Sequence, residues 1–89
     1  MIIKTKASAG TMESSDAYVE IEPFDNGLNI EIESVVIKQY GEKIKWAVSE
    51  VMKEQGIENA SVRVMDRGAL ECVIRARVET AVLRGRGDE

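Results

Sequence analysis

The stretch most suggestive of chemistry is Ala9-Gly10-Thr11-Met12-Glu13-Ser14-Ser15-Asp16, which holds two neighbouring hydroxyl groups. Gly10 permits backbone angles that other residues avoid, and serine and aspartate favour turns over regular strands. We therefore expect a surface loop on which Ser14 and Ser15 are exposed, and loops of this kind often contain functional groups. Taken alone, so short a motif more often marks a serine-rich turn without a chemical role.

The remaining residue types argue against a free-standing enzyme. The chain has 89 residues, no histidine and one cysteine, Cys72. It therefore lacks the usual general base near neutral pH and the commonest metal ligand, and its thiols are too few for a zinc finger or a dithiol redox site. No glycine-rich phosphate loop or nucleophile elbow is present. We expect no catalytic residue and no metal ligand in this chain.

Composition also limits where such a chain works and what it binds. At this length we expect a single domain over residues 1–89. A net charge of −4 argues against nucleic acid as a partner. No apolar run is long enough to span a membrane, and Lys4 and Lys6 interrupt any signal-peptide core. The single cysteine fits a reducing compartment, so we expect a cytoplasmic protein without a membrane partner.

Alternating hydrophobicity predicts a β-hairpin over residues 17–34. The turn is placed at Asn26-Gly27, because both positions tolerate the positive φ angles of a type I′ turn. This register sets carboxylates against each other on the outer face, where like charges destabilise a sheet. The opposed pairs are Glu20 with Glu33 and Glu22 with Glu31. Such an acidic face is expected to be solvated, or to meet a basic partner.

Helical periodicity follows over residues 35–55. Apolar residues recur every three or four positions, and Gly56 followed by Ile57 is typical of a left-handed helix end. The apolar positions are Val36, Tyr40, Ile44, Ala47, Val48 and Val51.

The last third of the chain allows two interpretations. A second hairpin over residues 60–76, turning at Asp66-Arg67-Gly68, would direct Cys72 into the core and precede a short helix over residues 77–84. Alternatively, one helix runs over residues 69–83, since the apolar residues there also fit the helical period. We favour the hairpin because its turn residues and cross-strand pairs agree.

These elements predict an α+β fold. The expected sheet is dominated by antiparallel pairing, consists of two β-hairpins, and is covered on one face by two helices in the order β-β-α-β-β-α. Residues 1–16 are expected to be irregular or weakly extended, and residues 85–89 to form a frayed tail.

Three blocks of the chain, taken together, are specific enough to indicate a protein family. They are Ala-Gly-Thr-Met-Glu-Ser-Ser-Asp at 9–16, Ser-Val-Val-Ile-Lys-Gln-Tyr-Gly at 34–41 and Asp-Arg-Gly-Ala-Leu-Glu-Cys-Val-Ile-Arg-Ala-Arg at 66–77. In order and spacing, over nearly the whole chain, they resemble the acyl carrier subunit (gamma chain) of citrate lyase. The resemblance implies a carrier in citrate fermentation and not a catalyst.

The resemblance also implies a modified residue. Ser14 would bear 2'-(5''-phosphoribosyl)-3'-dephospho-CoA through a phosphodiester, which makes the chain a phosphoprotein and residues 1–16 its prosthetic-group loop. Ser15 matches a position where the family also accepts glycine, so it is not the expected attachment site. The implied partners are the alpha (acyl transferase) and beta (citryl lyase) subunits of citrate lyase and the transferase that attaches the prosthetic group.

Two other functions remain open from the sequence. The acyl carrier subunit of malonate decarboxylase uses a serine and the same type of arm, although the block at 66–77 favours citrate lyase. A protein-interaction subunit without a prosthetic group would need only the acidic face.

Overall fold

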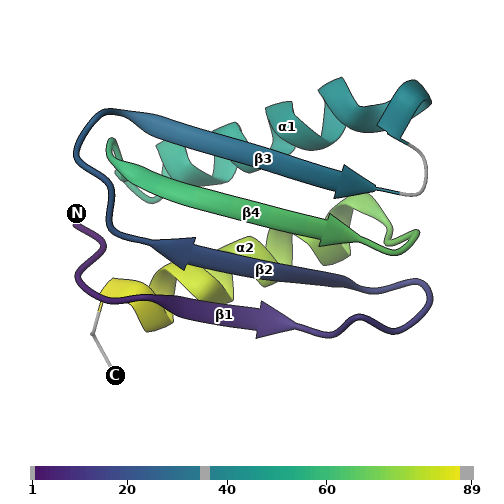
Figure 1. The fold of residues 1–89 in the computed structure, drawn as a ribbon, viewed down its shortest axis with the longest axis horizontal. Coiled ribbons are helices and arrows are strands. Elements are labelled where there is room, and N and C mark those ends of the chain that lie inside the picture. Colours follow the sequence, from purple (N-terminus) through teal and green to yellow (C-terminus); the bar gives the residue numbers. More distant parts are fainter. Residues whose placement is uncertain (1, 35–36, 87–89) are drawn as a thin grey trace.

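The computed structural model describes residues 2–34 and 37–86 of the chain, without the side chains of residues 37–40. One four-stranded sheet forms one layer, and two helices form the other (Figure 1). The elements are β1 (Ala7–Gly10), β2 (Ala17–Glu22), β3 (Leu28–Ser34), α1 (Ile37–Glu54), β4 (Ala60–Asp66) and α2 (Glu71–Arg86). Within the described residues, neither helix is long and apolar enough to cross a lipid bilayer.

This arrangement confirms an α+β fold with mostly antiparallel strand pairing and both helices on one face. The element order is β-β-β-α-β-α, so the predicted order was wrong at two places. A strand, β1, lies within the segment expected to be irregular or weakly extended, and no strand follows β4 in the described residues.

The sheet order is β1-β2-β4-β3, which places β4 between the two strands predicted to form the first hairpin. β2 pairs with β4 antiparallel, whereas β3 pairs with β4 parallel. A parallel pair needs a long crossover connection, and α1 supplies it between β3 and β4. The Asn26-Gly27 segment is therefore not a hairpin turn: the Gly27 N–H donates instead to the Asn59 side chain at 2.8 Å.

Insertion of β4 also changes the partners of the acidic side chains on the open face of the sheet. Arg63 of β4 lies in register with Glu20 on one side and Glu31 on the other. Its guanidinium is 3.0 Å from the Glu33 carboxylate and 3.9 Å from that of Glu20. The predicted carboxylate-to-carboxylate pairs are therefore wrong, because β4 separates the two strands and its Arg63 pairs with Glu20 and Glu33.

The core lies between the sheet and the helices. Val62 and Val64 are fully buried, because β4 is an inner strand and both helices cover the same face of the sheet. The predicted apolar stripe of α1 is confirmed over the described side chains, since Ile44, Ala47, Val48 and Val51 are all buried. The predicted positions Val36 and Tyr40 lie outside the described side chains.

The end of α1 also follows the prediction. Gly56 has a φ angle of +70°, and the Ile57 N–H donates to the Met52 carbonyl at 2.9 Å. These contacts satisfy backbone groups that a helix end otherwise leaves unpaired. Ile57 is buried against the core, which fixes where the chain leaves the helix.

The last third of the chain follows the helical alternative. α2 spans Glu71–Arg86, so the predicted second hairpin is wrong and Cys72 is exposed on the helix. The tail prediction is wrong for Gly85 and Arg86, which belong to α2, and its other residues lie outside the described ones. Gly85 is buried, and its carbonyl accepts hydrogen bonds from the backbone N–H groups of Lys4 and Thr5.

Candidate functional site

The loop with the two serines connects β1 to β2 and lies at one end of the sheet. β4 ends and α2 begins at the same end (Figure 1). Gly10 closes β1 with a φ angle of +98° and stands so close to the Ala17 carbonyl oxygen that a Cβ would overlap it. The predicted need for glycine here therefore has a specific cause, which is the close approach of the two strands at the start of the loop.

Ser14 and Ser15 are the two central residues of a tight turn. The Asp16 N–H donates to the Glu13 carbonyl at 3.2 Å, and both serines are exposed. Ser15 has a φ angle of +66°, which is the left-handed region that glycine adopts without strain. The two hydroxyls are thus not equivalent: position 15 has a backbone requirement that suits glycine, and Ser14 has none.

Backbone hydrogen bonds attach this turn to the segment after β4. The Ser15 N–H donates to the Arg67 carbonyl at 2.8 Å, and the Arg67 N–H donates to the Asp16 carbonyl at 2.9 Å. Residues far apart in sequence therefore hold each other in place, and Ser14 projects from a braced turn.

The Asp16 carboxylate is the polar centre of the loop. The Arg77 guanidinium donates to both its oxygens, at 3.0 and 2.9 Å, and the Thr11 hydroxyl donates at 2.6 Å. The Ala17 N–H donates a further hydrogen bond at 2.7 Å. Arg77 first, then Thr11 and the Ala17 amide, hold the pKa of the Asp16 carboxyl well below its usual range. This ion pair links the serine loop to the middle of α2.

Acid should weaken this link in a predictable direction. Because the pKa of Asp16 is lower in the folded than in the unfolded chain, its stabilising effect is complete above the unfolded pKa of about 4 and disappears as pH falls through the folded pKa. We expect Asp16→Asn to lower the thermal unfolding midpoint at pH 7, and the difference from the parent chain to shrink below about pH 4.

Thermal melts of both chains between pH 7 and pH 2 would test this expectation. Glu33→Gln is the matched control, because Glu33 meets Arg63 on the exposed sheet face and such pairs contribute little. A midpoint difference for Asp16→Asn that stays constant over the whole pH range would contradict the assignment.

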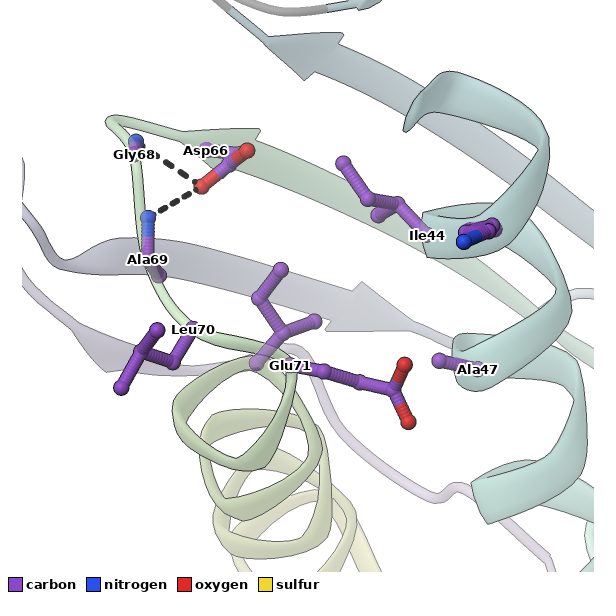
Figure 2. A pocket seen from close by; sticks show the side chains of 9 residues that line it. Ile44, Ala47, Asp66, Gly68, Ala69, Leu70 and Glu71 are labelled. Carbon is purple, nitrogen blue, oxygen red and sulfur yellow. Dashed lines mark hydrogen bonds between the residues drawn. The ribbon is translucent and has the colours of Figure 1, made fainter. Parts of the chain in front are cut away.

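A second carboxylate organises the start of α2. Asp66 is only 2% exposed, and one of its oxygens accepts hydrogen bonds from the N–H groups of Gly68, at 3.0 Å, and Ala69, at 2.8 Å (Figure 2). The other accepts a hydrogen bond from the Ser34 hydroxyl at 2.8 Å. Asp66 thus fixes the turn between β4 and α2, which is the turn whose Arg67 carbonyl holds Ser15.

Sequence reasoning found the exposed loop but not its supports. Nothing in the local pattern showed that Asp16 would meet Arg77, which is 61 positions away. The Asp-Arg-Gly turn was predicted, but not the hydrogen bonds by which the Asp66 side chain binds the Gly68 and Ala69 N–H groups within it. In the described ranges, no group of three or more His, Cys, Asp or Glu side chains is arranged to hold a metal ion.

Comparison with known proteins identifies the family. Residues 4–85 match the family described as malonate decarboxylase delta subunit (MdcD). The citrate lyase acyl carrier protein of Haemophilus influenzae strain PittEE is 54% identical over 84 residues, covering 94% of this chain and 87% of the relative. Those of Pectobacterium atrosepticum and Lactiplantibacillus plantarum are 50% and 49% identical, each over 94% of this chain and 88% of the relative.

The fold has a counterpart among solved structures. A chain in the crystal structure of a Pseudomonas malonate decarboxylase hetero-tetramer in complex with malonate superposes with a TM-score of 0.80. The match covers 94% of this chain and 87% of that one at 22% sequence identity, so the likeness is one of fold. By its sequence relatives, the chain belongs to the family of citrate lyase acyl carrier proteins.

Proposed function

We propose that this chain is the covalent acyl carrier subunit of a citrate lyase and that Ser14 bears its prosthetic group. The group implied by the family resemblance is the phosphoribosyl dephospho-coenzyme A arm, attached by a phosphodiester. The single observation that supports this assignment most strongly is the position of Ser14, exposed at the tip of a turn that is braced from below.

The residues present fit such an attachment. Among the described residues, no hydrogen bond holds the Ser14 hydroxyl, so it is free to be modified. Arg67, whose backbone carbonyl fixes the turn, is exposed and makes no ion pair within the described part of the chain. An arginine near the turn is available to a phosphodiester, which guanidinium groups bind well.

The chain's own task is then to present and tether, not to catalyse. When bound, the arm supplies a thiol that holds acetyl or citryl as a thioester while the alpha and beta subunits convert citrate to acetate and oxaloacetate. No base in this chain is needed to activate Ser14, because the attaching transferase supplies that chemistry. Tethering keeps the cargo at a high effective concentration between two active sites.

The runner-up is the carrier subunit of malonate decarboxylase. The matched family description and the shared fold support a relationship to that enzyme. Identity of about 50% to citrate lyase carriers, against 22% to the solved malonate decarboxylase chain, favours the citrate lyase assignment.

The test is the intact mass of the full chain, produced with and without the enzymes that make and attach the arm. We expect an added mass equal to one arm only when those enzymes are present. The loaded chain should then restore citrate cleavage when it is mixed with the alpha and beta subunits. It should not restore malonate decarboxylation when it is mixed with the corresponding subunits of malonate decarboxylase. An unmodified chain that restores full citrate cleavage would show instead a plain interaction subunit.

A further inference from the structure

A pocket opens beside the serine loop, between α1 and the start of α2. Its volume is about 340 Å³, which lies within the range of small-molecule sites. Ile44 and Ala47 of α1 lie on one side of it, and Ala69 and Leu70 lie on the other (Figure 2). Ile74 of α2 also lines it. Leu70, which also lines the pocket, is 71% exposed, so its side chain is available to a ligand.

The pocket is close to Ser14. Gly68, which lines it, follows Arg67, and the Arg67 carbonyl accepts the hydrogen bond from the Ser15 N–H. Ser14 is therefore separated from the pocket edge by two peptide steps and one hydrogen bond, a span of no more than about 15 Å. A coenzyme A-type arm, with its adenosine, ribose, diphosphate and two amide units, is longer than this span and can fold back over it.

The lining chemistry selects among possible occupants. The walls are apolar, and the charged groups around them are Lys43, Asp66 and Glu71. The Asp66 carboxylate already accepts three hydrogen bonds, and Glu71 is paired with Arg75 at 3.0 Å. A small uncharged acyl group fits this lining. A cargo with several carboxylates would lose hydration and would meet two acids against a single cation, Lys43.

We propose that this pocket holds the thiol end of the arm carried by Ser14 of the same chain, together with the small uncharged acyl group on that thiol. This inference rests on the proposed function. The occupied pocket covers Leu70 and shields the thioester from water between visits to the partner subunits. Exchange of the acetyl group for the multiply charged citryl group releases the arm, so the pocket distinguishes the two loading states.

The test uses the full chain, with its arm confirmed by intact mass and its thiol acetylated. Hydroxylamine is added, and its cleavage of the thioester is followed by mass and compared with that of free acetyl-coenzyme A. If the pocket is occupied for about four-fifths of the time, the tethered thioester reacts about fivefold more slowly. Leu70→Ser should remove this protection while leaving the core intact, because the Leu70 side chain is mostly exposed.

Two further variants complete the design. Ala69→Phe fills the pocket and should also remove protection, and it is interpreted only if its thermal melt matches that of the parent chain. Leu83→Ser makes the same chemical change as Leu70→Ser at an exposed leucine of α2 that does not line the pocket, so it should keep full protection. Amide shifts in NMR spectra on acetylation should cluster at residues 68–71 in the parent chain and be absent in Leu70→Ser.

The outcomes separate this inference from the function on which it rests. A chain that never gains the arm would overturn both. A chain that gains the arm on Ser14, but whose thioester reacts as fast as acetyl-coenzyme A, would overturn the pocket assignment alone. Equal protection in the parent chain, Leu70→Ser and Ala69→Phe would do the same.

Discussion

Replacing Ser14 by alanine should abolish citrate cleavage by the reconstituted complex. The loss is expected to reach the background of the assay, because the proposed function bonds the arm to the Ser14 Oγ and requires the tethered thiol at every step of the cycle. The fold should be unaffected, since the Ser14 side chain is exposed and no hydrogen bond within the described residues depends on it. Activity is measured as oxaloacetate formed after mixing with the alpha and beta subunits.

The matched control is Ser15→Gly. Glycine removes the neighbouring hydroxyl and at the same time suits the φ angle of +66° at this position, so the turn that presents Ser14 is kept. This variant should be loaded and active like the parent chain. Full activity of Ser14→Ala, or complete loss in Ser15→Gly with Ser14 intact, would mean that the wrong hydroxyl was assigned.

Gly10→Ala should be among the most damaging single substitutions in the chain. The alanine would pay about 1–2 kcal/mol for the left-handed backbone angle. It would also place its Cβ against the Ala17 carbonyl oxygen and 3.2 Å from the Arg77 Cδ. Overpacking of this kind costs about 1–3 kcal/mol, so we expect the free energy of unfolding to fall by about 2–5 kcal/mol in urea denaturation.

Gly27→Ala separates the two causes. Gly27 has a φ angle of +85°, but a Cβ there would meet no atom within 4 Å. Its expected cost is therefore the backbone strain alone, about 1–2 kcal/mol. If Gly10→Ala costs no more than Gly27→Ala, the close approach of β1 and β2 does not hold the loop in the way described. Loading of Ser14 should fall in Gly10→Ala and stay unchanged in Gly27→Ala.

Local sequence patterns predicted those parts of the fold that depend on local interactions. The stripe of α1 from Ile44 to Val51 and the glycine stop at Gly56 come from residues within a few positions of each other. The serine loop was predicted for the same reason, since glycine, serine and aspartate have turn preferences of their own. The exposure of Ser14 follows from that loop.

Strand pairing was not predictable in this way. The segment 17–34 has good hairpin alternation, and only the arrival of β4 from beyond α1 shows that its two strands are separated. Arg63 stabilises the arrangement with β4 in the middle, because it pairs with carboxylates that would face each other in a hairpin. Paired residues of β3 and β4, such as Ser34 and Asp66, are 32 positions apart, because a parallel pair requires the whole crossover.

The prediction for the segment after β4 was wrong for a different reason. Residues 69–76 fit both a strand and a helix period, and the Asp-Arg-Gly turn suited a hairpin. In the structure, Asp66 uses its side chain to bind the Gly68 and Ala69 amides, which leads into a helix. Arg75, which pairs with Glu71 and Glu50, then reinforces that helix and its contact with α1. These side-chain contacts favour the helix over the strand, two alternatives that the hydrophobic pattern fits equally well.

The most direct test of the central claim is fragmentation mass spectrometry of the chain, isolated from an assembled and working complex. The account predicts one peptide over residues 9–16 that bears the complete arm, with the phosphodiester localised to the Ser14 Oγ. A working complex in which that peptide is unmodified, or in which the arm is on Ser15 or elsewhere in the chain, would contradict it.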